Sequence, residues 1–263
     1  MPFTFSHPAA VLPIRRYGVL SALVVGSLMP DMLYFVPQLP HNSYGHTLQG
    51  IFFFCLPVGV CLLWLFHRFL KRPLVSLFPV VQQQKLLAVS KDFQFWPFSR
   101  FVAICFSILL GAASHVTWDS FTHQQGWAVQ QFAILRRPVP ITPLVAPTVC
   151  ELLQYVSSVI GAVLLLIYYR RWLRQTQARA ATGEVHLTTS MRILLLLVFG
   201  FGATLPAISR MMNNPFWYGR QSFVGYVATA GIKVLCIEII LFSLLWHLVR
   251  RLRRNSSSER VPE

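Results

Sequence analysis

The sequence is poor in charged residues, and above all in acidic ones. Only 12% of its 263 residues are charged, and 23 Lys and Arg stand against 8 Asp and Glu. A chain with 55% hydrophobic residues and a mean hydropathy of +0.55 is too apolar for an ordinary soluble domain. Several apolar runs approach the roughly 20 residues that cross a bilayer. We therefore predict an all-α, polytopic membrane protein.

Cysteine is also scarce, and no internal repeat or long linker is present. The five cysteines are odd in number and lack metal-type spacing, and four of them lie within apolar runs. This distribution favours packing over a disulfide framework. The apolar stretch after Arg16 ends in Met29-Pro30-Asp31 rather than in a small-residue cleavage site, so we expect no cleavable signal peptide.

The net charge of +15 would suggest nucleic acid as a partner of a soluble protein. Here the basic residues cluster between apolar runs, as they do on the cytoplasmic face of membrane proteins. We expect membrane lipids as partners and no nucleic acid.

The apolar runs predict about six crossings, at residues 17–30, 48–66, 101–118, 152–169, 193–209 and 223–247. Residues 1–16 contain three prolines and favour a short, broken segment on or partly within the membrane. Residues 73–100 mix apolar and polar side chains, which is typical of an interfacial segment. We expect one transmembrane domain over residues 1–249 and a basic, then polar, disordered tail over 250–263.

The basic residues also predict the orientation. With six crossings and a cytoplasmic N-terminus, most of the 23 Lys and Arg fall on the cytoplasmic side. Lys233 lies within the last span, and four arginines fall outside: Arg136, Arg137, Arg210 and Arg220.

One crossing ends in the stretch His115-Val-Thr-Trp-Asp119-Ser-Phe-Thr-His123. On a helix its His, Asp and His are four residues apart, and each step of four passes a full turn by about 40°. The three side chains therefore line one stripe and can act as ligands of a zinc-like ion. The alternative is a polar stripe that ends a membrane helix where water begins.

In the predicted orientation this stripe shares the outer side with Asp31, His41 and His46. Asp31 ends the first crossing and His46 opens the second, so the loop between them can bring the two together. Charged and imidazole groups at a membrane boundary are costly unless they are paired or coordinated, so they indicate a functional site. Asp31 can also be a simple turn residue, and His41 a solvated loop residue.

The blocks MPFTFSHPA, MPDMLYF, YGHTLQG and SHVTWDSFTH resemble an uncharacterised bacterial integral-membrane family, the domain of unknown function 4184. That family resembles the membrane-bound metal-dependent hydrolases. The sequence departs from the hydrolases in having Pro-Asp-Met-Leu for Pro-Asp-x-Asp, which is one carboxylate fewer, and Gly45-His46-Thr47 for Thr-His-Ser. The resemblance implies a bacterial inner membrane and a set of metal ligands: His7, Asp31, His46, His115 and Asp119, with His123 as a further candidate.

For a hydrolase, such a site predicts a divalent metal, zinc first, that generates hydroxide from bound water. Asp119 or Asp31 would be a ligand or a general base, and His41 or His123 would orient the water or protonate a leaving group. A substrate arriving from the headgroup layer would be a phosphoester lipid or a lipid-linked intermediate.

The rival prediction is a non-enzymatic membrane protein, either a transporter or a structural partner, with a structural metal or none. It depends on Lys233 and Glu238 in the last apolar run, which could serve an ion pathway or pair with other helices. Glu151 at the start of the fourth crossing is explained by the positive end of its helix.

Overall fold

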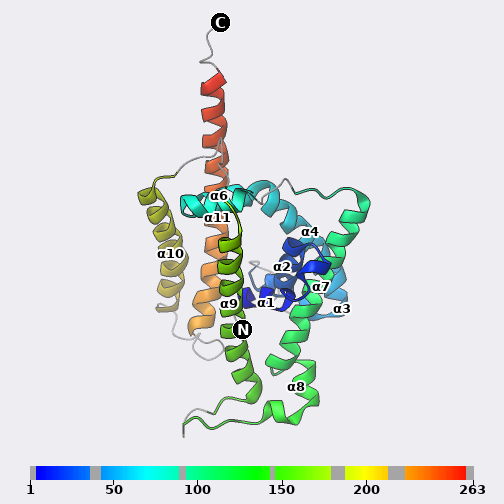
Figure 1. Ribbon diagram of the computed structural model, residues 1–263. Helices are drawn as coiled ribbons and strands as arrows, with labels where there is room; N and C mark the ends of the chain where they lie inside the picture. Colours follow the sequence, from blue (N-terminus) through cyan, green and yellow to red (C-terminus); the bar gives the residue numbers. More distant parts are fainter. Residues whose placement is uncertain are drawn as a thin grey trace. The chain divides into compact units, whose positions relative to one another are not determined.

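The computed structural model describes residues 4–35, 43–88, 93–142, 146–178, 187–212 and 223–258. In these ranges the regular structure is helical, apart from one isolated antiparallel bridge between Pro138 and Thr148. The α-helices shown in Figure 1 are α1 (Pro8–Val11), α2 (Leu20–Leu28), α3 (Leu48–Gly50), α4 (Leu56–Leu65), α5 (Lys71–Ser76), α6 (Val80–Ala88), α7 (Phe98–Thr122), α8 (Trp127–Gln131), α9 (Val149–Gln175), α10 (Thr189–Met212) and α11 (Phe223–Ser258). The prediction of an all-α protein is confirmed.

Shorter helical turns connect these elements. The π-helical turns Ile51–Cys55 and Phe66–Leu70 join α3, α4 and α5 into one continuous helix. The 3-10 helices are Thr4–Ser6, Arg15–Tyr17, Met29–Tyr34, Ser43–His46 and Ala133–Arg136.

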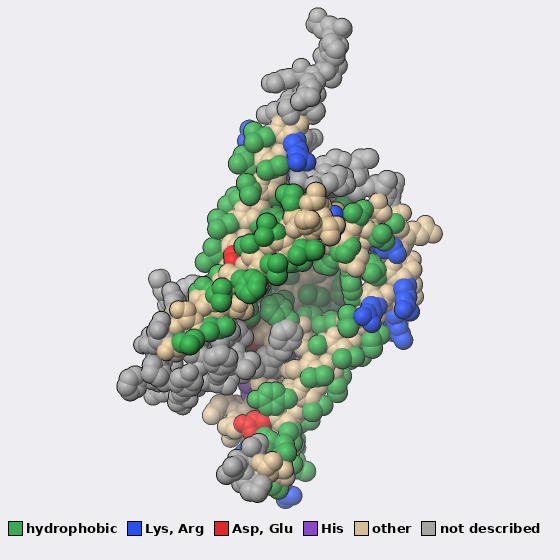
Figure 2. Space-filling model, turned by 90° about the vertical axis from the view of Figure 1, so that its left-hand side faces the viewer, with side chains coloured by type: hydrophobic (Ala, Val, Ile, Leu, Met, Phe, Trp, Pro, Cys, Tyr) green, Lys and Arg blue, Asp and Glu red, His purple; other side chains and the backbone are tan. Residues whose placement is uncertain are grey.

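Among the described residues, five helices are long and apolar enough to cross a membrane: Leu48–Ser76, Phe98–Gln131, Val149–Gln175, Thr189–Pro206 and Ala230–Arg253. Hydrophobic side chains are spread along the described helices of the face drawn in Figure 2, as expected for helices in contact with lipid. The predicted first crossing is the shorter apolar helix Leu20–Tyr34. Nine α-helical and six 3-10 residues give it a length of about 25 Å, less than the roughly 30 Å hydrocarbon layer.

The chain divides into two compact units. The first contains Met1–Leu33, Leu39–Leu63 and Gln94–Trp172, and the second contains Tyr34–Gln38, Trp64–Phe93 and Leu173–Glu263. The six predicted site residues of the described chain all belong to the first unit. A single transmembrane domain over residues 1–249 stays a prediction, because two contact-defined units can belong to one domain.

The core of the first unit is the packing of α2 against α7, which lie side by side in Figure 1. A Cβ added to Gly26 would overlap the carbonyl oxygen of Ile108, and one added to Gly111 would overlap that of Leu23. Close approach of two membrane helices requires such small residues at the contact. The two glycines therefore fix the distance between the helices that carry Asp31 and His115.

The N-terminal segment is short and broken, as predicted, and it is anchored to the first unit. Pro8 opens α1, where a missing backbone N–H costs nothing. The Ser6 hydroxyl donates a 2.7 Å hydrogen bond to the Ser158 carbonyl of α9, and α1 packs on both α2 and α7. His7, between Ser6 and Pro8, is thereby held in the interior with 2% of its surface exposed.

The second unit is built on the pairing of α10 with α11. A core cluster joins Leu187, Phe199, Phe242 and Trp246. Residues 73–76 of the predicted interfacial segment are the end of the continuous helix Leu48–Ser76, and residues 80–88 form α6. Lys85 of α6 donates to the Leu173 carbonyl near the end of α9. Helix α11 continues to Ser258, so residues 250–258 of the predicted tail are helical rather than disordered, and residues 259–263 lie outside the described chain.

Candidate metal centre

The polar stripe predicted on one crossing is formed by α7. His115 and Asp119 lie one turn apart on its buried face, with exposed fractions of 0% and 6%. Their side chains meet, because His115 Nε2 is 3.2 Å from Asp119 Oδ2. His123 is the residue that caps α7 and has an extended backbone, and its Nδ1 lies 3.4 Å from Asp119 Oδ1.

Asp31 and His46 come from two 3-10 helices that pack on each other. Asp31 lies in Met29–Tyr34, which continues α2, and His46 ends Ser43–His46, which precedes α3. A Cβ at Gly45 would overlap the carbonyl oxygen of Pro30, so glycine lets the two backbones touch. This contact places His46 Nε2 3.5 Å from Asp31 Oδ1.

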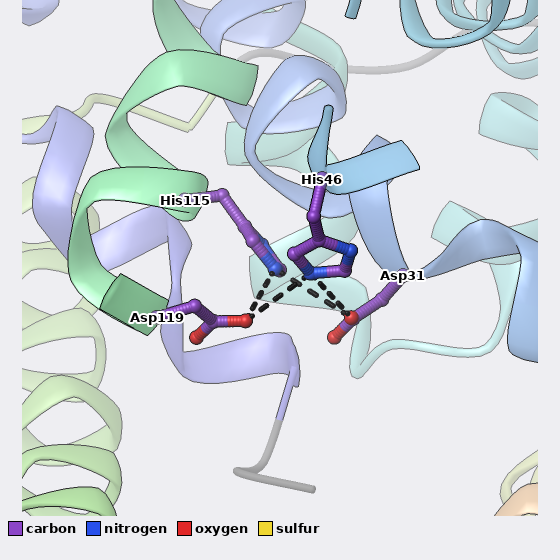
Figure 3. A group of neighbouring side chains, drawn as sticks. All are labelled: Asp31, His46, His115 and Asp119. Carbon is purple, nitrogen blue, oxygen red and sulfur yellow. Dashed lines mark hydrogen bonds and ion pairs between the residues drawn. The ribbon is translucent and has the colours of Figure 1, made fainter. Parts of the chain in front are cut away.

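The two pairs converge on one point, as Figure 3 shows. His46 Nε2 is 3.3 Å from Asp119 Oδ2, and His115 Nε2 is 3.6 Å from Asp31 Oδ1. One ligand atom from each of Asp31, His46, His115 and Asp119 lies within 4.8 Å of the others. Two imidazole nitrogens and two carboxylate oxygens are a ligand set that a zinc-like ion accepts. We call these four residues the His/Asp cluster.

His7 lies against the cluster but approaches it differently. Its ring stacks on that of His115, with centroids 3.9 Å apart, and its Nε2 is 3.0 Å from Asp119 Oδ1. Asp119 therefore directs Oδ2 toward His46 and His115, whereas Oδ1 faces His7 and His123. Direct coordination of a metal by His7 or His123 stays a prediction.

Hydrogen bonds at Nδ1 of His115 and His7 determine which ring nitrogen is unprotonated. His115 Nδ1 is 2.7 Å from the Ser27 carbonyl oxygen, and His7 Nδ1 is 3.1 Å from that of Thr4. A carbonyl only accepts, so each Nδ1 carries the hydrogen and a neutral ring presents a lone pair at Nε2. The buried His115 Nε2 accordingly finds no hydrogen-bond partner among the described residues.

This arrangement fits a cation. Without a cation, the unprotonated ring nitrogens would face carboxylate oxygens and their lone pairs would repel one another, unless the imidazoles take up extra protons. A metal-binding histidine typically donates its other N–H to a carbonyl, as His115 does to Ser27. The residues present therefore match a divalent metal, and they do not identify which one.

His46 shows the competition between protons and a metal. Burial by itself lowers the pKa of His46, but hydrogen bonds to Asp119 and Asp31 and the charge of Asp31 outweigh it. The net pKa of His46 is raised above its usual value. A metal that binds here must displace that proton.

Two contributors to the site escaped prediction. Thr4 donates a 2.6 Å hydrogen bond to Asp31 Oδ2, the oxygen that faces away from the two histidines. Ser27 contributes its backbone carbonyl. Thr4 lies three residues before His7 in the MPFTFSHPA block, so the sequence could have indicated it. Every residue has a backbone carbonyl, so no residue type indicates the contribution of Ser27.

The other described histidines, His67 and His247, lie outside the His/Asp cluster. His41 is outside the described residues. In the second unit His67 stacks on Phe93, and His247 hydrogen-bonds the Phe69 carbonyl at 2.9 Å. Glu151 accepts from the Thr148 backbone N–H and hydroxyl at the start of α9, which confirms its role at that helix end.

The fold and the cluster define a multi-pass α-helical membrane protein with a buried His/Asp site suited to a metal ion. The chain belongs to the family described as a domain of unknown function (DUF4184), whose model matches residues 1–244. No curated protein and no solved structure matches the chain. The resemblance to the membrane-bound metal-dependent hydrolases stays a prediction.

Proposed function

We propose that the protein is a membrane-bound, metal-dependent hydrolase of a phosphoester at the outer face of a bacterial inner membrane. One observation carries the proposal: the buried His115 Nε2 has no hydrogen-bond partner among the described residues and faces the carboxylates of Asp31 and Asp119. Enclosing four titratable side chains in a membrane protein is costly unless they serve a site.

Asp31, His46, His115 and Asp119 would hold a divalent metal, which would supply a Lewis acid and lower the pKa of bound water toward neutrality. The chain's own residues divide the remaining work. Thr4 and Ser27 hold Asp31 and His115 in their ligating orientations. Asp119 links the cluster to His7 and to the more exposed His123, because its second oxygen faces both of these rings.

His123 is the residue we assign to proton transfer. Its side chain is 33% exposed, far more than that of Asp119 or His115, so it can reach both solvent and a bound substrate. The Thr122 hydroxyl lies 3.3 Å from its Nδ1 and steadies the ring. A histidine in this position can protonate the leaving oxygen of a phosphoester.

The first test is the metal content of protein purified in detergent without chelator and measured by mass spectrometry. We expect about one divalent metal per chain, lost in His115→Ala and in Asp119→Asn. His247→Ala is the matched control, because it removes a histidine that bonds a backbone carbonyl outside the cluster. Wild-type protein that stays metal-free after metal is re-supplied would refute the proposal.

A second arm separates catalysis from a structural metal. His123→Gln should retain the metal and lose about 100-fold or more in turnover of a phosphodiester, as removal of a general acid does. A purely structural metal instead predicts that ligand variants lose thermal stability and that no variant, nor the wild type, turns over any ester.

A transporter is the second candidate, and Glu238 is the observation that favours it. This carboxyl group lies within a membrane-spanning helix, opposite Gly202 of α10, where a Cβ would overlap its Oε1. Its Oε2 is buried without a hydrogen-bond partner among the described residues. Loss of ion-coupled uptake in Glu238→Gln, with Asp119→Asn unaffected, would favour transport over hydrolysis.

A further inference from the structure

A groove runs beside the cluster on the surface of the first unit. It has a volume of about 540 Å³ and lies between α1, α7 and α9. That size is within the range of roughly 300–1,000 Å³ typical of ligand pockets. Its lining includes Ala10, Leu110, Ala113, Trp118, Phe121 and Leu153.

The lining offers hydrocarbon rather than polar contacts. Four hydroxyl residues take part, but Ser114 donates to the Gly111 carbonyl within its own helix. The Ser157 hydroxyl accepts from the Trp118 indole at 3.1 Å, a contact that ties α7 to α9. Small side chains such as Ala10 and Ala113 leave the space open.

Two residues at one end of the groove are neighbours of the candidate site. Trp118 and Thr122 line the groove, and they flank the ligand Asp119 and the proton-transfer residue His123 in the sequence. The His7 ring lies 6.0 Å from the Trp118 ring, and the Thr122 hydroxyl contacts His123. From Leu110 to Thr122 the groove follows α7 over about 18 Å.

Two of the three walls, α7 and α9, belong to helices that are long and apolar enough to span a membrane, so lipid hydrocarbon is the natural neighbour of the groove. We infer that the groove holds the hydrocarbon chain of a lipid phosphoester whose phosphate lies at the His/Asp cluster. This inference rests on the proposed function and names its substrate class: an acyl-chain lipid that enters sideways from the bilayer. A water-soluble phosphoester would not need the groove.

The test uses metal-loaded protein in phosphatidylcholine nanodiscs that contain phosphatidic acid with a diazirine in its acyl chain. After irradiation, we expect crosslinks at Ala113 and Leu153 several-fold above those at Val102 and Phe106. These two controls are exposed residues of α7 outside the groove. Equal labelling of groove and control positions would overturn the inference.

Filling the groove gives the matched variants. Ala113→Trp and Leu153→Trp obstruct it from α7 and α9, and either should remove the enrichment, whereas Phe106→Trp should not. Because the two variants act from different walls, one that fails to fold leaves the other as the test. Enrichment that survives in a folded, obstructed variant would also overturn the inference.

Turnover of the water-soluble ester bis(p-nitrophenyl) phosphate separates the two proposals. If both hold, Ala113→Trp keeps this turnover and loses that of the lipid. If the wild type cleaves neither ester, the proposed hydrolase fails, and the crosslinks still decide the groove. If the wild type cleaves both esters and Ala113→Trp does too, the groove inference fails and the hydrolase stands.

Discussion

Replacing Thr4 by Val tests whether the cluster is a preorganised ligand set. The two side chains have nearly the same shape, so the substitution removes the 2.6 Å hydrogen bond to Asp31 Oδ2 and little else. Thr4 and Asp31 are 6% and 3% exposed, so water does not readily replace the lost donor.

The expected magnitude follows from the cost of a buried acceptor left without its donor. That cost is about 1–3 kcal/mol, and more for a charged group. Asp31 directs Oδ1 toward the two histidines, where it would act as a metal ligand, and Thr4 orients the carboxylate through Oδ2. Loss of such an orienting bond typically lowers metal affinity by about 10- to 100-fold.

The assay is competition between the protein and a fluorescent chelator of known affinity, in one detergent and at one pH. Thr204→Val is the control, because it removes a hydroxyl that bonds the Gly200 carbonyl within its own helix α10. Thr4→Val should weaken metal binding by the stated factor and Thr204→Val should not. Equal affinities in both variants and the wild type would refute the idea that Thr4 organises the site.

Two more predictions follow from the packing and from His46. Gly26→Ala should lower both the melting temperature and the metal occupancy, because the added methyl group overlaps the Ile108 carbonyl. Gly200→Ala is the control: nothing lies within 4 Å of its added methyl group, so it should change neither quantity in the same measurements. Because the pKa of His46 is raised in the folded protein, protonated His46 stabilises the metal-free fold. This contribution is complete below the pKa of the unfolded chain, about 6.5, and is lost as the pH rises through the pKa of the folded protein. The melting temperature of the metal-free protein should therefore fall as the pH rises, and the metal affinity should increase over the same range because the proton leaves His46. A His46→Gln variant whose melting temperature showed the same fall with pH would contradict this assignment.

The sequence predicted the helices and the local part of the site, because both arise from short-range patterns. Apolar runs near the thickness of a bilayer leave helices as the only structure that satisfies the backbone. His115 and Asp119 are one turn apart, so any helix places them together.

The rest of the site depends on contacts between residues distant in the sequence. His7 meets Asp119 across 112 positions, and its approach requires the N-terminal segment to be held by α9. No periodicity encodes that contact, and no side chain signals the Ser27 carbonyl. Helix α11 extends into the predicted tail as far as Ser258, because basic residues that suggest solvation also continue a helix well once it has begun.

The shortness of the helix Leu20–Tyr34 has a consequence for the bilayer itself. As a crossing, this helix would be about 5 Å shorter than the hydrocarbon layer, and lipids would relieve the hydrophobic mismatch by thinning locally at a cost of fractions of a kcal/mol per Å. Thinning on the side of Asp31 would lower the lipid phosphates toward the depth of the cluster. Membrane thickness would then act as a control on the protein, with short-chain bilayers favouring substrate access and long-chain bilayers opposing it.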